Sequence, residues 1–215
     1  MRILITAGPT REPIDPVRYL SNRSSGRMGY ALAQAAREAG HAVTLVSGPT
    51  DLAPPAGANF VPVETAKQMF DAVGGMIKAH EVAIFSAAVA DYRPVEVATE
   101  KIKKSEPRMT LELERTPDIL GSARVQFGFE GFLVGFAAET QNVLPEAHGK
   151  LRRKACDLIV ANDVSKPGIG FESQDNEVTL CLPGGRSQPL PRASKMEIAR
   201  QLIQFIADRV GDQRK

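Results

Sequence analysis

Short apolar runs alternate with segments of helical periodicity along the first part of the chain. The runs at positions 3–7, 41–47, 60–63 and 82–85 are typical of buried strands. The segments between them, 25–39 and 65–79, carry apolar residues at helical spacing. Strands that alternate with helices in this way favour a parallel sheet with helices on both faces, joined by right-handed crossovers. The pattern therefore predicts a Rossmann-like α/β fold.

The pattern changes in the second half of the chain. Residues 95–108 are charged and poor in apolar side chains, which predicts an exposed flap, and residues 109–114 alternate strictly, as in a half-exposed antiparallel strand. Pro117 begins a short helix. Further strands are expected at 132–138 and 157–162, helices at 142–154 and 193–209, and a hairpin from 176 to 190 across Pro183-Gly184-Gly185. We thus expect one domain, 1–215, whose mostly parallel sheet carries an antiparallel excursion.

The first strand leads into a long polar loop and then into a helix start. Ser24 or Ser25 is the expected N-cap of that helix. A glycine-bearing helix start after a strand favours phosphate, because free backbone N–H groups and the helix dipole both face the ligand. An ordinary first βα unit is the alternative, but a loop as long as 10–22 is usually functional. Neither G-x-G-x-x-G nor a P-loop stands here.

The stretch AGPTREPIDPVRYLSNRSSGRMG at positions 7–29 resembles the nucleotide-binding loop of phosphopantothenoylcysteine synthetases. These enzymes join 4′-phosphopantothenate to cysteine in coenzyme A biosynthesis, and the resemblance extends to the final helix. It implies that Gly8, Ser25 and Gly26 belong to the nucleotide site. It also implies that Asn22 binds the acyl-nucleotide intermediate and that Arg18 is needed in the active site.

A second segment of small residues leaves the predicted strand at 82–85. Its aspartate, Asp91, is suited to accept hydrogen bonds from ribose hydroxyls or a base amine, whereas on the residues alone it equally suits a turn cap. The resemblance places this segment in the nucleotide pocket and carries over to Phe85, Ser86, Ala87 and Asp91.

The run Glu100-Lys101-Ile102-Lys103-Lys104 would ordinarily be a solvated stretch of charge. In the family that the chain resembles, a lysine at the position of Lys101 contacts the nucleotide and assists catalysis. A lysine on a mobile flap suits this role, since its charge is able to follow pyrophosphate out of the site.

The resemblance adds further residues to the nucleotide site. On the residues alone, Pro117 marks only a helix start, and Lys150 and Lys154 share one helix face as surface lysines or nucleic-acid contacts. By resemblance the two lysines point at the nucleotide phosphates, and Phe136 is the ring near the base. The implied additions are Thr116, Pro117, Asp118, Ile119, Phe136, Lys150 and Lys154.

Composition narrows the class of protein. The chain has 215 residues, 43% of them hydrophobic and 24% charged, which is typical of a globular domain. Its net charge of +2 gives no indication of nucleic acid, and no apolar run reaches membrane-spanning length. Cys156 and Cys181 lie in apolar contexts without metal spacing, which indicates buried thiols in a reducing compartment. We expect a cytoplasmic protein with no metal-ligating residues, no membrane and no nucleic acid.

The expected activity follows from the resemblance. Bacterial members use CTP and eukaryotic members ATP, and the AAVADYRP and EKIKK stretches are similar to bacterial ones. We therefore expect 4′-phosphopantothenate and L-cysteine as substrates, an acyl-cytidylate intermediate, CTP as co-substrate and magnesium (Mg2+) with the phosphates. The family's enzymes are homodimers with sites built from both subunits, and 109–114 is a candidate for part of that interface. The flavin-dependent decarboxylase that precedes this activity in many bacteria is absent from the sequence.

Other functions stay open on the residues alone. A dinucleotide-dependent reductase would suit the sheet, but Ser47-Gly48-Pro49 stands where an acidic residue should close the second strand. A non-catalytic nucleotide-binding or nucleic-acid-binding module would rest on the charges of Lys103-Lys104 and Arg152-Arg153.

Overall fold

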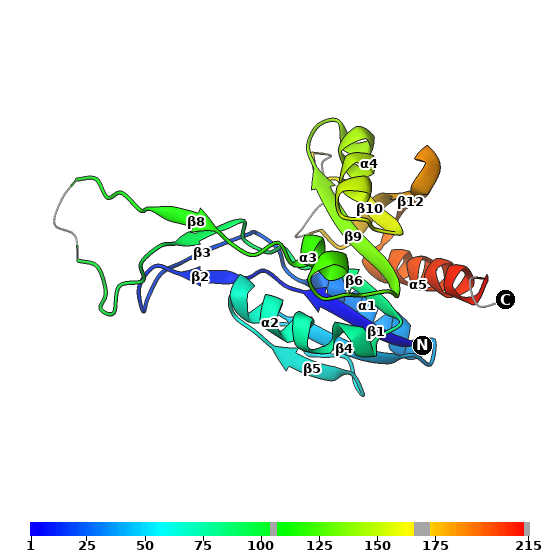
Figure 1. Cartoon of the computed structure of the whole chain (residues 1–215), viewed down its shortest axis with the longest axis horizontal. Coiled ribbons are helices and arrows are strands. Elements are labelled where there is room, and N and C mark those ends of the chain that lie inside the picture. The colour runs from blue at the N-terminus through cyan, green and yellow to red at the C-terminus, as the bar shows by residue number, and fades with distance from the viewer. Residues whose placement is uncertain (104–106, 166–172, 213–215) are drawn as a thin grey trace.

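An eight-stranded, mostly parallel sheet forms the body of the protein (Figure 1). The computed structural model describes residues 1–103, 107–165 and 173–212. The strand order is β12-β11-β10-β9-β6-β1-β4-β5, and its last six strands have the order of a doubly wound nucleotide-binding sheet. The parallel strands are β1 (Arg2–Ala7), β4 (Ala42–Ser47), β5 (Asn59–Pro62), β6 (Val82–Phe85), β9 (Phe132–Glu139) and β10 (Leu158–Asp163). The predicted α/β fold is confirmed.

An antiparallel hairpin closes one edge of this sheet. It consists of β11 (Asp175–Cys181) and β12 (Ser187–Ser194), joined by the short 3-10 turn η2 (Pro183–Gly185). The turn coincides with the expected Pro-Gly-Gly connection, where Gly184 and Gly185 both have positive φ. The excursion expected at 176–190 is therefore confirmed, with slightly longer strands.

Helices cover both faces of the sheet. On one face lie α1 (Arg27–Glu38) and α5 (Lys195–Asp212); on the other lie α2 (Ala66–Met76), which continues into η1 (Ile77–Ala79), α3 (Ile119–Val125) and α4 (Val143–Arg153). Side chains of a strand point alternately to the two faces, so Ile3 and Ile5 enter the first cluster while Leu4 enters the second. This two-sided burial explains why the parallel strands are continuous apolar runs.

The starts of the helices differ in how their first N–H groups are satisfied. Thr65 caps α2 through a capping box with Gln68. At α1 the expected Ser24 or Ser25 cap is wrong: Gly26 is the N-cap, in a left-handed conformation with φ 76°, and no side chain caps the helix. The Ser24 hydroxyl instead accepts a hydrogen bond from the Gly26 N–H at 3.3 Å.

Two short hairpins project together from the body as an arm (left in Figure 1). One consists of β2 (Arg11–Pro13) and β3 (Tyr19–Ser21), the other of β7 (Tyr92–Pro94) and β8 (Leu113–Arg115). The Ala98 N–H donates to the Ile14 carbonyl at 3.0 Å and so joins the two chain segments. We call residues 11–21 and the described part of 92–115 the arm. The loop expected at 10–22 is thus largely a hairpin.

The strand expected at 109–114 is wrong in its extent. Only Leu113–Arg115 is a strand, paired antiparallel with β7, and the segment before it is irregular. The alternation in the sequence is genuine, but beyond the bond from the Val95 N–H to the Glu112 carbonyl the opposing segment bonds Ile14 through its Ala98 N–H instead. The described residues of the expected flap, 95–108, are mostly exposed as predicted; residues 104–106, which include Lys104, lie outside the described part of the chain.

The amino end of α1 packs directly on the end of β1. A Cβ atom at Gly29 would lie 2.5 Å from the Cβ atom of Ala7 and 2.7 Å from the Ser86 hydroxyl. Both separations are shorter than any normal contact, so only a glycine permits this approach.

We expect Gly29→Ala to lower the free energy of unfolding by about 1–3 kcal/mol, because the added methyl overpacks the contact with Ala7. Gly75→Ala is the matched control: it lies in α2 with open space around its Cβ position, and alanine there should raise the free energy of unfolding by about 0.5–1 kcal/mol. Urea unfolding of both variants measures the difference. Equal effects of the two substitutions would contradict the packing argument.

Candidate active site

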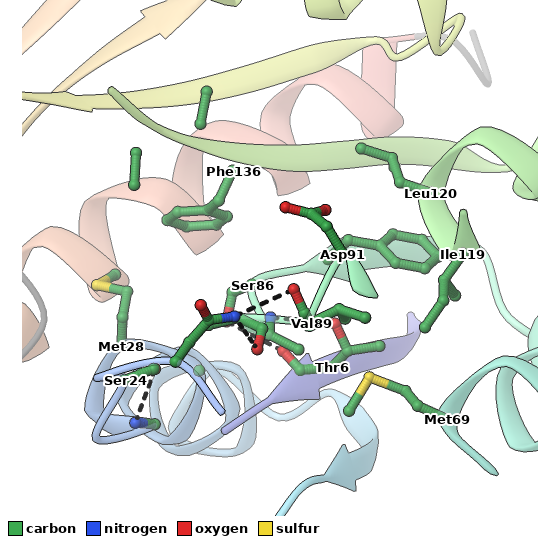
Figure 2. A pocket seen from close by; sticks show the side chains of 18 of the residues that line it. Thr6, Ser24, Met28, Met69, Ser86, Val89, Asp91, Ile119, Leu120 and Phe136 are labelled. Carbon is green, nitrogen blue, oxygen red and sulfur yellow. Dashed lines mark hydrogen bonds between the residues drawn. The ribbon is translucent and has the colours of Figure 1, made fainter. Parts of the chain in front are cut away.

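A cavity of about 730 Å³ opens at the carboxyl ends of β1, β6 and β9 (Figure 2). From β1 the chain winds outward through β4 and β5, then crosses back to β6 on the other side. Ligands of open α/β sheets bind at such a reversal of strand order. The cavity also receives the start of α1, the segments 86–92 and 115–120, and residues of α4 and α5.

The segment after β6 is fixed by side chains from the first loop. The Asn22 amide donates to the carbonyls of Ala88 and Val89 at 3.0 and 3.1 Å. The Ala90 N–H donates to the buried Thr10 hydroxyl at 3.0 Å. Asn22 therefore holds one wall of the cavity in place, while its side chain still lines the cavity as expected.

Asp91 and Phe136 point into the cavity from opposite walls (Figure 2). Phe136 lies on β9, and its carbonyl accepts a hydrogen bond from the Lys150 ammonium at 2.7 Å. Burial lowers the pKa of Lys150, since a desolvated ammonium loses its hydration. The predicted residues Phe85, Ser86 and Ala87, at the end of β6, also line the cavity.

Lys154 pairs with Asp118, which caps α3 and accepts the Gly121 N–H at 2.9 Å. Burial alone would raise the pKa of Asp118, but the hydrogen bonds from Lys154 and Gly121 outweigh it and the pKa is lowered. Lys154 and Lys150 lie one helical turn apart and both line the cavity, as do Thr116, Pro117 and Ile119. The geometry thus brings these residues together at one cavity, while their expected contact with a nucleotide stays a prediction.

The opposite end of the cavity contains residues that the sequence analysis missed. Arg27, Met28, Asn176 and Lys195 line it beside the expected Ser25 and Gly26. The Lys195 side chain is nearly buried and its ammonium donates to the Ser173 carbonyl at 2.5 Å. Burial, and secondly the charge of Arg27, lower the pKa of Lys195 to about 8.

Only some of these missed residues could have been recognised from the sequence. Arg27 follows Gly26 directly in the long motif, so it was within reach of that motif. Asn176 and Lys195 come from β11 and α5, where no local pattern singles them out. Asn162, whose role the sequence left undecided, lines the cavity with a buried Oδ1 for which the described residues offer no hydrogen-bond donor.

Three expected site residues do not line the cavity. Gly8 lies beneath Gly26, where a Cβ atom on Gly26 would come within 3.3 Å of its Cα atom. Arg18 and Lys101 are on the arm, away from the cavity-lining residues of the same chain. Arg18 instead pairs with Asp15 at 2.6 Å.

In the described ranges no group of His, Cys, Asp or Glu side chains could hold a metal ion. Likewise, no described helix is both long and apolar enough to cross a membrane. The two cysteines are free and buried, and burial raises the pKa of the Cys156 thiol to about 12.

The cavity thus combines a glycine-bearing helix start with the Phe136 ring, several ammonium groups and the carboxylates of Asp91 and Asp118. On a doubly wound sheet this combination defines an α/β protein whose site is suited to an anionic ligand. A family model described as "DNA/pantothenate metabolism flavoprotein C-terminal domain" matches residues 1–210. The chain belongs to this family.

Relatives with this sequence pattern are longer proteins. The coenzyme A biosynthesis bifunctional protein CoaBC of Vibrio vulnificus (strain YJ016) is 48% identical over 211 residues, which cover 97% of this chain and 52% of that protein. Its namesake from Escherichia coli (strain K12) is 44% identical over 218 residues, covering 100% of this chain and 53% of that protein. The chain therefore spans about half the length of the curated relatives it matches.

Solved structures have the same fold. A crystal structure of the C-terminal domain of the bifunctional protein CoaBC matches with a TM-score of 0.83 and 44% identity, covering 98% of this chain and 96% of that one. A Cab2 mutant in complex with phosphopantothenate-cysteine matches with a TM-score of 0.82 over 98% of this chain and 86% of that one. Its identity of 18% makes that second match a likeness of fold.

We expect the stability of the wild type to rise relative to Lys195→Met between about pH 8 and the usual lysine pKa of 10.5. In that interval the unfolded chain binds a proton that the folded Lys195 does not, so folding becomes more favourable as pH rises. Below about pH 8 the difference between the two proteins should be constant. Melting temperatures from about pH 7 to about pH 10 measure it, with exposed Lys67→Met as the control for loss of a lysine. A flat difference across the range would contradict the lowered pKa.

Proposed function

We propose that the chain is a phosphopantothenate–cysteine ligase that uses CTP. The observation that carries this proposal is one cavity in which Asp91, Phe136 and Lys150 meet the start of α1, in a chain of this family. A nucleotide and a second phosphate-bearing substrate both fit a site that is cationic at each end. The C-terminal domain of the coenzyme A biosynthesis bifunctional protein CoaBC is similar to this chain in sequence and in fold.

The chemistry requires activation of a carboxylate. The carboxylate of 4′-phosphopantothenate attacks the α-phosphorus of CTP, pyrophosphate leaves, and an acyl-cytidylate forms. The amine of cysteine then attacks the acyl carbon, CMP leaves with the carboxylate oxygen, and an amide remains. The protein contributes position and charge rather than a covalent step.

Each wall of the cavity has a part in this scheme. Asp91 and the carboxyl end of β9 hold the ribose and the base, while Lys150 and Lys154 face the phosphates. An incoming phosphate favours the charged form of Lys150, whose pKa burial lowers. Asn22 fixes the 88–89 carbonyls with its amide N–H groups and so shapes the wall beside the acyl phosphate.

Magnesium would accompany the triphosphate in this scheme. Asp91 and Asp118 are the carboxylates among the described residues that line the cavity, and Asp118 is already paired with Lys154. This fits an ion held mainly by phosphate oxygens and water, as Mg2+ commonly is. The ion would neutralise charge on the phosphates.

The arm is the part of the chain through which a second subunit would complete the site. Arg18 and Lys101, the remaining expected catalytic residues, lie on it and not at the cavity of their own chain. The arm also exposes large apolar side chains, a feature of protein interfaces: Val17, Tyr19, Tyr92, Val95, Val97, Met109 and Leu113. We therefore propose a homodimer in which each arm carries Arg18 and Lys101 to the partner's cavity.

The free cysteines support a reducing, cytoplasmic setting for this enzyme. A dinucleotide-dependent reductase is less well supported, because β4 ends at Ser47, whose hydroxyl bonds Gly48 and Tyr30, and no carboxylate stands there for a ribose. The net charge of +2 likewise gives a nucleic-acid module little support.

We expect pyrophosphate release that depends on 4′-phosphopantothenate, with CTP supporting turnover about 10²-fold or more better than ATP. A pocket that pairs its polar groups with a pyrimidine edge leaves them unpaired against adenine. A coupled pyrophosphate assay with each nucleotide measures this, and NADPH oxidation in the same mixture tests the reductase. Equal turnover with CTP and ATP would contradict the specificity, and absence of pyrophosphate release would contradict the ligase.

We expect two inactive variants to restore activity when they are co-expressed. Asp91→Ala damages the cavity and Lys101→Gln the arm, so a mixed dimer with shared sites keeps one intact site. With random pairing the mixture should regain about a quarter of the wild-type activity. If each arm instead serves its own cavity, every site in the mixed dimer carries a lesion and nothing is regained.

A further inference from the structure

The arm contains a buried carboxylate that joins its two hairpins. Asp15 lies in the turn between β2 and β3, and its side chain is completely buried although it is a charged group on a projecting hairpin. Its Oδ1 accepts the N–H groups of Val17 and Arg18 at 2.8 and 2.9 Å. These bonds fix the carboxylate within its own turn.

The other carboxylate oxygen of Asp15 bonds both Arg18, an expected catalytic residue, and the backbone next to Lys101. Its Oδ2 accepts Nε and Nη2 of Arg18 at 3.0 and 2.6 Å, and it accepts the Ile102 N–H at 3.1 Å. Nη2 of Arg18 donates in turn to the Ile102 carbonyl at 3.0 Å. Asp15, Arg18 and the backbone of Ile102 thus form one closed set of hydrogen bonds, which we call the arm clamp.

The arm clamp acts directly on the backbone next to Lys101. The N–H of Ile102 belongs to the planar peptide group that joins Lys101 to Ile102, so fixing this N–H fixes that plane. The Ile102 carbonyl fixes the following plane as well. The side chain of Lys101 remains exposed, so its position is set by its backbone and not by packing.

We propose that Asp15 is a positioning residue that holds Arg18 and Lys101 as one unit at the end of the arm. This proposal rests on the proposed function for the roles of the two cations. A lysine in an unanchored loop loses conformational freedom when it reaches the reacting phosphates, whereas an anchored one has already lost it. The Arg18 side chain keeps 42% of its surface exposed, so its outer edge remains open to a phosphate.

The charge of Asp15 is suited to this task. Its hydrogen bond from Arg18 is the main cause that holds its pKa well below the usual range, with the backbone N–H groups adding to it. The carboxylate therefore stays ionised at any pH at which the enzyme would work. An amide in its place would turn donor hydrogens toward the Arg18 guanidinium and lose part of the clamp.

The test uses Asp15→Asn in the full chain, with Asp71→Asn as the matched control. Asp71 pairs with Lys67 at 2.6 Å on α2, is more than half exposed and lies outside both the arm and the cavity lining. We expect Asp15→Asn to lower kcat for acyl-cytidylate formation by about 10²-fold with little change in the KM for CTP, because misplaced groups cost about that much. Asp71→Asn should keep the wild-type rate, since exposed ion pairs contribute little.

Hydrogen exchange supplies a readout that does not depend on activity. We expect the Ile102 amide to lose protection in Asp15→Asn, while the Ala98 amide, bonded to Ile14, keeps it. A normal rate despite faster exchange at Ile102 would overturn the proposal, as would a slow rate with unchanged exchange. Unchanged exchange at Ile102 alone would show that the arm clamp does not form.

A second variant is needed in case Asp15→Asn disrupts the structure of the whole arm. If Ala98 also loses protection, Ile102→Pro decides, because it removes the N–H donor and leaves the Asp15–Arg18 pair intact. A rate loss of about tenfold or more supports the proposal, and a normal rate overturns it. A wild type that makes no pyrophosphate would instead refute the proposed function, and the exchange result would still report on the arm clamp.

Discussion

The cavity depends on the close contact between the start of α1 and the end of β1. Gly26 lets the chain enter the helix with φ 76°, and Gly29 lets the helix approach Ala7 closer than any side chain would permit. The start of the helix, which no side chain caps, therefore lines the cavity together with Ser86. Any bulk between helix and sheet would move the segment after β6, from which Asp91 points into the same space (Figure 2).

The fold was predictable because its determinants are local and repeated. Each parallel strand is an apolar run, and each helix has its own periodicity, as in α2 with its Thr65 capping box. The arm was not predictable in the same way. Residues 109–114 alternate as a strand does, yet only Leu113–Arg115 finds a partner, since pairing depends on where the segment containing Ala98 goes. The sequence pattern of a segment indicates which secondary structure it prefers, and its neighbours in the fold determine whether that structure forms.

The same distinction applies to the site. The sequence pointed to Asp91 and Phe136 because they lie on or after sheet strands in segments that resemble the family. Both residues line the cavity. Lys195 gave no local signal, because what sets it apart is burial beside Arg27, and burial is a tertiary property. The prediction of a serine N-cap for α1 failed for a related reason. Serine is the better N-cap in general, but here the close approach of helix and strand selects glycine.

The proposed division between cavity and arm has a kinetic consequence. Lys150 and Lys154 are already engaged, by the Phe136 carbonyl and by Asp118, so a phosphate gains from them only what exceeds these bonds. The cavity therefore contributes mainly to binding that is shared by substrate and transition state. Lys101 is exposed, and in the proposed homodimer it would reach the phosphates only when the partner's arm is in place, so its charge would favour the transition state over the bound substrate. For this reason a rigid anchor beside Lys101 matters more for turnover than for affinity.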